Sequence, residues 1–211
     1  TNVGHDRSQL SNMAQQAREA TGCDDLTVLA DRGYFSGPEI LACEEAGITA
    51  YVPKTQTSNN QAKGLFGKRD FIYIAKDDEY ECPAGERLVH RCTAEDKGKV
   101  IHRYWLSACS GCQMKSKCTT GKERRVSRWE HEAVLEGMEE RVDRMPNCMR
   151  IRGSTVEHPF GTIKSWLGPK HFQMKTLKHV GTEMSLHVLA YNLKRMLQMF
   201  GAVPLMEAIR A

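Results

Sequence analysis

Residues 8–52 constrain the fold most, because helical and strand patterns alternate there twice. Residues 8–20 have apolar side chains at helical spacing, and the apolar run at 26–30 is typical of a strand buried on both faces. A second helix is expected over residues 38–47, which begin with proline and end with glycine, and a second strand follows at 48–52. This αβαβ order predicts an α/β fold in which helices cover a sheet.

The pattern changes after the second strand. Residues 54–68 are polar and rich in Gly, Asn and Gln, which predicts a loop. Short strands separated by turns are expected next, at residues 70–75, 79–82 and 100–106. We therefore predict a small β-rich, Cys-containing insertion over residues 55–127, between a first part of the core at 1–54 and a helical part at 128–211.

The helical part is expected to contain helices at residues 127–141, 155–166 and 176–200. The longest of them has apolar residues at helical spacing, so we expect one of its sides to face the core. That side consists of Leu177, Val180, Met184, Tyr191 and Met196.

Composition and charge narrow the class of protein. With 40% hydrophobic and 27% charged residues, the chain is neither disordered nor fibrous. No apolar run approaches the ~20 residues that cross a bilayer, and no signal-peptide pattern opens the chain, so a cytoplasmic protein without membrane contact is expected. The net charge is only +4, but residues 97–128 carry nine Lys or Arg against one acid, and residues 141–178 carry eight against two. These segments form either a polyanion-binding surface or a solvated basic face.

Asp31 is the first residue suited to chemistry. It follows a predicted strand directly, and carboxylates at the C-terminal edge of a central strand lie where α/β folds place their active sites. The alternative is a turn former or a helix cap, since a helix is expected to begin nearby.

Glu157 is the second such residue. Arg152 precedes it by five residues, and Lys164 follows it by seven, about two helical turns. This arrangement suits a metal-binding acid with basic neighbours that grip phosphate. The alternative is a helical Glu in ordinary surface ion pairs.

Four cysteines in the predicted insertion have the spacing of a metal site. Cys109 and Cys112 form a CxxC pair, Cys118 follows, and Cys82 precedes a Pro-Ala-Gly turn. Structural zinc favours closed four-Cys sites, and a small β-rich unit gains stability from such a metal. Cys92, His90 or His102 could replace one ligand, and the alternative is a set of reduced thiols in a small core. Basic residues around the cluster suit DNA binding, namely Lys115, Lys117, Arg124 and Arg125.

These motifs carry a family resemblance. Asp31-Arg-Gly-Tyr34 and Val156-Glu-His-Pro-Phe-Gly-Thr-Ile-Lys164 strongly resemble the DDE transposases of bacterial insertion sequences. The segments from Thr1 to Leu10 and from Thr182 to Arg195 are similar to that family as well.

The resemblance implies an RNase H-like, retroviral integrase-like core in which Asp, Asp and Glu bind two Mg²⁺ or Mn²⁺ ions. Asp31 is then the second acid and Glu157 the third, with the insertion between them. Lys164 and Arg152 match basic residues of the family's signature, which implies contacts with the transposon-end backbone. The partners implied are transposon-end and target DNA and further copies of the chain, with the protein associated with the nucleoid.

The sequence departs from the family pattern in two respects. The spacing from Arg152 to Glu157 is one residue longer than in the commonest form, so Arg150 and Arg152 compete for one role. The first acid has no match, and Asp6 is the only early candidate. We therefore expect the C-terminal part of a transposase that is catalytically incomplete as given. The alternatives are a non-catalytic DNA-binding remnant and a zinc-stabilised protein-interaction module.

Overall fold

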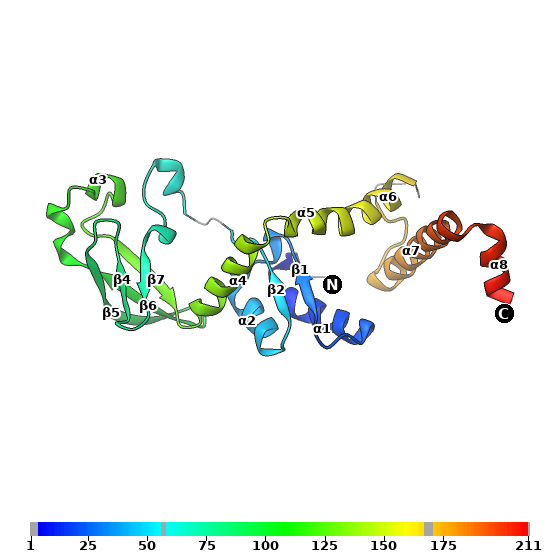
Figure 1. The fold of residues 1–211 in the computed structure, drawn as a ribbon, viewed down its shortest axis with the longest axis horizontal. Coiled ribbons are helices and arrows are strands. Elements are labelled where there is room, and N and C mark those ends of the chain that lie inside the picture. The colour runs from blue at the N-terminus through cyan, green and yellow to red at the C-terminus, as the bar shows by residue number, and fades with distance from the viewer. Residues whose placement is uncertain (1–3, 56–57, 167–170, 211) are drawn as a thin grey trace.

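The computed structural model describes residues 4–55, 58–166 and 171–210. The molecule is elongated, with an antiparallel sheet at one end, a small α/β unit in the middle and the last two helices at the other end (Figure 1). The three predicted parts, 1–54, 55–127 and 128–211, follow this order along the molecule, and their limits as domains stay a prediction.

The middle unit has the predicted αβαβ order. Helix α1 spans Leu10–Thr21, strand β1 Thr27–Leu29, helix α2 Gly37–Glu45 and strand β2 Thr49–Tyr51. The two strands pair in parallel, with Val28 opposite Ala50. Proline lies in the first turn of α2, as its fixed φ angle favours.

The first core lies where this unit packs against helix α4 (Glu132–Arg144). Its fully buried members include Ile40, Cys43, Val52 and Met138. The prediction that the first strand is buried on both faces is wrong, because β1 is exposed or only half-buried along its length. A strand of a two-stranded sheet has a neighbour along one edge only, which leaves its other edge uncovered.

The antiparallel sheet has five strands in the order β3-β4-β5-β6-β7. They span Ile72–Ile74, Glu79–Glu81, Arg87–Asp96, Lys99–Trp105 and Arg125–Trp129. Three of them were expected, whereas β5 and β7 were not. Most of β5 is half-buried or exposed and polar, so it has no apolar alternation that would mark it as a strand.

The second core belongs to this sheet alone, and consists of Phe71, Tyr80, Leu88, Tyr104 and Val126. Three tyrosine rings meet in it, with the Tyr80 and Tyr104 centroids 5.2 Å apart in an edge-on arrangement. Such aromatic pairs add to the free energy of apolar burial. The sheet therefore has a hydrophobic centre of its own.

Asp78 accepts hydrogen bonds from two tyrosines at the edge of the second core, Tyr104 at 2.7 Å and Tyr73 at 2.8 Å. These bonds, first that from Tyr104, hold the pKa of the Asp78 carboxyl below its ordinary value of 3.8 although desolvation raises it. A depressed pKa stabilises the fold above the ordinary value, and this stabilisation is lost as the pH falls through the folded-state pKa.

We expect Asp78→Asn to lower the free energy of unfolding at neutral pH by less than about 1 kcal/mol, because the carboxylate is exposed and solvent screens it. The deficit should shrink as the pH falls below the ordinary value of 3.8. Urea unfolding across that range measures it, with Asp77→Asn as the control. A deficit that does not change with pH would contradict this account.

Ion pairs connect the start of the inserted segment to α4. Lys68 contacts Glu132 at 2.6 Å, Arg69 contacts Glu139 at 2.9 Å, and Lys54 contacts Glu139 as well. The helix predicted at 127–141 begins five residues later than expected. Its first three residues belong instead to β7, whose register pairs them with β6.

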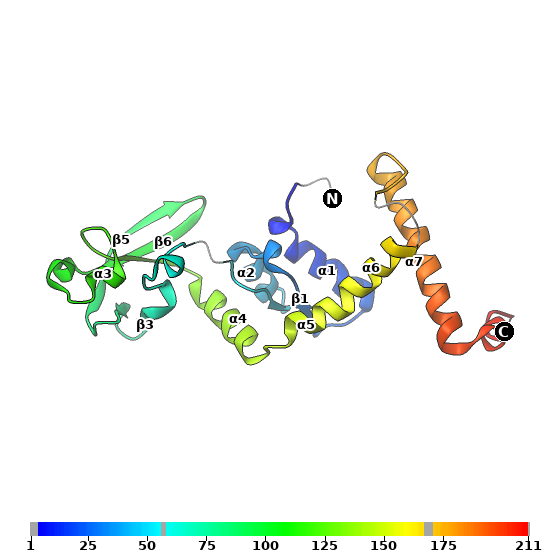
Figure 2. The same cartoon turned by 90° about the horizontal axis from the view of Figure 1, so that it is seen from above.

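Beyond α4 the chain is helical. A continuous rod consists of α5 (Cys148–Arg152), a π-helical turn (Gly153–Glu157) and α6 (His158–Trp166), as Figure 2 shows. Helix α7 spans Leu177–Phe200 and α8 spans Ala202–Arg210. Short helices complete the described residues: η1 Asp6–Ser8, η2 Arg32–Tyr34, η3 Gln61–Lys63, η4 Lys68–Asp70, η5 Ser107–Gly111 and α3 Lys115–Cys118.

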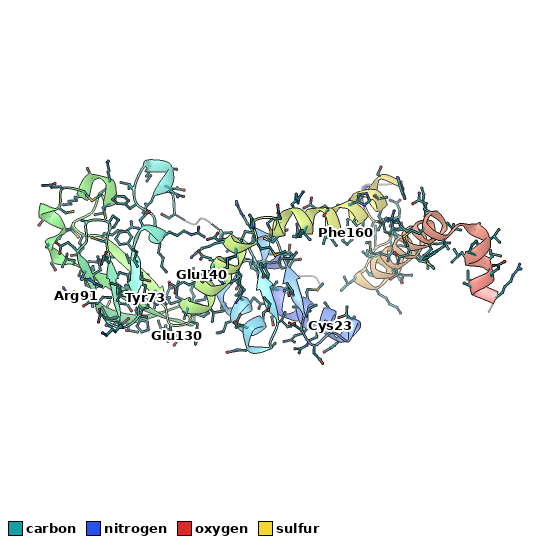
Figure 3. The ribbon with its side chains drawn as sticks, viewed as in Figure 1. Cys23, Tyr73, Arg91, Glu130, Glu140 and Phe160 are labelled. Atoms are coloured by element: carbon teal, nitrogen blue, oxygen red, sulfur yellow. The ribbon has the colours of Figure 1, made fainter. Side chains whose placement is uncertain are left out.

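The prediction that one side of the longest helix faces the core is wrong, because no residue of α7 is buried. Leu177 is 64% exposed, and Phe160 on α6 is exposed as well (Figure 3). Periodicity indicates an apolar side, but whether another element covers it depends on the tertiary structure. Within the described residues, no helix is both long and apolar enough to cross a membrane.

Candidate active site

Asp31 lies directly after β1 and caps the 3₁₀ helix η2. Its Oδ1 accepts a hydrogen bond from the Gly33 amide at 2.8 Å. A methyl group on Gly33 would lie 2.9 Å from the same oxygen, so this turn favours glycine. The structural alternative, a turn-forming Asp, is therefore correct for one of its two carboxylate oxygens.

The other oxygen of Asp31 faces the helical rod. Arg152 donates from Nη2 to Asp31 Oδ2 at 3.1 Å and from Nη1 to Glu157 Oε1, also at 3.1 Å. One guanidinium thus holds together two carboxylates that lie far apart in the sequence. The Arg152 side chain is 17% exposed, whereas the Glu157 side chain is 71% exposed.

The π-helical turn explains the unusual spacing in this motif. A π-helix closes its hydrogen bonds between residues i and i+5, so it brings Arg152 and Glu157, five residues apart, onto one side. An α-helix would place Val156 there instead. Among the described residues, Arg152 and not Arg150 contacts both carboxylates, which decides between the two arginines.

Two further features surround Asp31. A cavity of about 390 Å³ beside it is lined partly by Pro53, Pro146 and Met149. Burial raises the pKa of Tyr34, and the negative charges of Asp6 and Asp31 raise it further, whereas Arg152 lowers it. Asp6 therefore lies close enough to act on the same tyrosine.

The other basic residues predicted near Glu157 do not join this contact. Lys164 lies two turns further along the rod, on α6, and is exposed, as is Arg150 on α5. Both are open to a ligand that follows the rod. Over residues 4–55, 58–166 and 171–210, no group of three or more His, Cys, Asp or Glu has the arrangement of a metal centre.

The four predicted cysteine ligands line one cavity of about 620 Å³, together with apolar residues of the second core: Cys82, Cys109, Cys112 and Cys118. Burial raises the pKa of the Cys118 thiol, Arg124 lowers it, and the other three cysteines raise it. The alternative ligands His90 and His102 instead both contact the Thr93 hydroxyl, at 3.0 and 2.9 Å.

The predicted basic residues beside this cavity are partly stacked on aromatic rings. The guanidinium of Arg124 lies 5.1 Å from the Phe71 ring centroid, and that of Arg125 lies 4.9 Å from the Trp105 centroid. Lys115 and Lys117 belong to the short helix α3. These residues form one basic surface around the cysteines.

Arg128 is a structural residue that the charge pattern did not separate from its neighbours. It is 7% exposed and makes hydrogen bonds with Glu136 and, at 3.3 Å, with the Tyr80 hydroxyl. Its guanidinium also lies 3.7 Å from the Tyr73 ring centroid. The signal was present in the alternation of β7, where Val126 and Arg128 point to the same buried face.

Comparison with known proteins identifies the family. No curated protein and no solved structure matches the chain. The family model described as "Transposase DDE domain" matches residues 81–197, which is just over half of the chain and includes Glu157 and the cysteine cluster. On that match, and in agreement with the motifs at Asp31 and Glu157, the chain belongs to the transposase DDE domain family.

Proposed function

We propose that this chain carries the second and third acids of a DNA transposase that cleaves and rejoins DNA strands for a bacterial insertion sequence. Asp31 is the second acid and Glu157 the third. The observation that supports this most is the Arg152 guanidinium, which contacts both carboxylates across 121 residues of sequence. Membership of the family implies DNA as the substrate, Mg²⁺ or Mn²⁺ as the cofactor and an RNase H-like fold, and the chain is mixed α/β.

The chemistry of the donors fits a divalent ion. Asp31 and Glu157 offer carboxylate oxygens, which Mg²⁺ and Mn²⁺ prefer, and both acids are accessible to solvent. Two such ions would supply an activated water or 3′-hydroxyl and stabilise the departing oxygen. In this proposal the first acid comes from outside the described residues, because Asp6 belongs to a short helix in a loop rather than to a strand.

The protein's own residues position the DNA. Lys164 and Arg150 are exposed along the rod that carries Glu157, so they suit contacts with the phosphates of a transposon end. The basic surface of Lys115, Lys117, Arg124 and Arg125 offers a second contact region at the far end of the molecule. Two separated basic regions suit an oligomer that holds paired transposon ends and target DNA.

The test is strand cleavage of a duplex that carries the element's terminal repeat, by the transposase read from the complete gene. We expect cleavage with Mg²⁺ or Mn²⁺ and none with EDTA. The second candidate, a non-catalytic DNA-binding remnant, is favoured by the lack of a three-acid group in the described residues. Binding of the duplex without cleavage under every metal condition would support the remnant and exclude the enzyme.

We further propose that Cys82, Cys109, Cys112 and Cys118 bind a structural zinc ion. The support is that all four line one cavity and that Cys118 responds electrostatically to the other three. Four thiols are the donor set of closed zinc sites. Since the described arrangement is not that of a metal centre, binding would draw the sulfur atoms closer together.

We expect Cys109→Ser to lose the bound zinc and to lower the melting temperature of the protein, because zinc binding contributes directly to folding. Zinc content by mass spectrometry and thermal unfolding measure the two effects. Cys23→Ser, at an exposed cysteine outside the cavity, is the control. A wild-type protein purified without zinc, and equally stable with and without a chelator, would exclude the structural metal.

A further inference from the structure

We propose that Arg152 is a counter-ion that keeps Asp31 and Glu157 closed to divalent ions until a DNA phosphate takes over its guanidinium. This one side chain would then couple metal binding to DNA binding. The inference rests on the proposed function, since it takes the two acids as metal ligands.

The first step is that Arg152 neutralises both acids. Its two terminal nitrogens donate to Asp31 Oδ2 and Glu157 Oε1, each at 3.1 Å. A guanidinium stays protonated at every pH at which a protein folds, and its forked donors suit two acceptors at once. The repulsion between the two carboxylates is therefore offset without any metal.

The second step is that a metal ion and Arg152 compete for the same atoms. Both oxygens of Asp31 already have donors, because Oδ1 accepts from the Gly33 amide and Oδ2 from Arg152. The Gly33 amide is held in the turn of η2, whereas the Arg152 donor is at the end of a long side chain. Metal binding at Asp31 thus displaces the arginine more readily than the amide.

The third step concerns the released guanidinium. A divalent ion beside it repels it, whereas a DNA phosphate offers the same paired oxygens as a carboxylate. DNA therefore stabilises the released form of Arg152, and that form leaves the acids open to metal. By thermodynamic linkage, DNA must strengthen metal binding by the same factor by which metal strengthens DNA binding.

The experiment measures Mn²⁺ binding by electron paramagnetic resonance, with and without saturating amounts of a short DNA duplex. In wild type we expect DNA to tighten Mn²⁺ binding. Arg152→Gln should bind Mn²⁺ roughly threefold to tenfold more tightly without DNA, the scale of one or two exposed ion pairs, and DNA should give little further gain. Arg144→Gln, at an exposed ion pair of α4, should behave as wild type.

Weaker Mn²⁺ binding in Arg152→Gln, or an unchanged gain from DNA, would overturn the coupling. Arg152→Lys keeps the charge without the fork, so it should tighten Mn²⁺ binding less than Arg152→Gln and serves if the latter does not fold. Asp31→Asn and Glu157→Gln separate this inference from the proposed function. If neither changes Mn²⁺ affinity in either background, the acids are not metal ligands, and the proposed function fails with the coupling.

Discussion

Replacing Glu157 by Gln, or Asp31 by Asn, should lower the strand-cleavage rate of the complete transposase by about 10³-fold or more. Each change removes the negative charge of a proposed metal ligand, and a loss of this size corresponds to about 4 kcal/mol of transition-state stabilisation. Single-turnover cleavage of terminal-repeat DNA measures the rate, in parallel with gel-shift binding of the same DNA.

Folding should change little in these variants. Glu157 is mostly exposed, so its ion pair with Arg152 contributes less than about 1 kcal/mol to stability. In Asp31→Asn the amide oxygen can still accept from Gly33. Glu140→Gln is the matched control, since Glu140 is an exposed acid of α4 that pairs with Arg144 (Figure 3). Cleavage at the wild-type rate in either variant would remove that carboxylate from the active site.

Arg128→Met should lower the free energy of unfolding by about 3 kcal/mol, the largest stability effect that we expect. The Arg128 side chain is 9% exposed and bonds to Glu136, with Nη2 and Oε2 at 2.9 Å, and to the Tyr80 hydroxyl. Removing one partner of a largely buried pair leaves polar groups without donors. We place the loss at the low end of the range for buried pairs because Glu136 is 42% exposed.

Urea unfolding monitored by circular dichroism measures this loss. Arg87→Met is the control, because Arg87 makes an exposed ion pair at 3.7 Å with Glu81 in the same sheet. It should cost less than about 1 kcal/mol. Equal losses in the two variants would mean that Arg128 does not join the sheet to α4.

Local patterns were sufficient for part of the structure. The αβαβ order, the parallel pair of strands and the position of Asp31 after β1 all follow from apolar runs and turn residues in the sequence. The long helix α7 was predicted within one residue at its start. These features depend on interactions among residues that are close in sequence, so the sequence around them contains the necessary information.

Other features depend on partners far away in the chain. Strand β5 exists because β4 and β6 pair with it, and β7 takes up residues with helical propensity because β6 offers it a free edge. The choice of Arg152 over Arg150 needed the π-helical turn, which no residue pattern announced.

The sequence by itself determined which residues carry chemistry: two acids at the ends of conserved-looking motifs within one chain, a set of four cysteines and a basic surface. Only the tertiary structure decided how they meet. It brings Asp31 and Glu157 to one guanidinium and gathers four thiols around one cavity. It also leaves the apolar side of α7 exposed. The physical reason is that charge and apolarity are properties of single residues, whereas contact and burial depend on every element that packs around them.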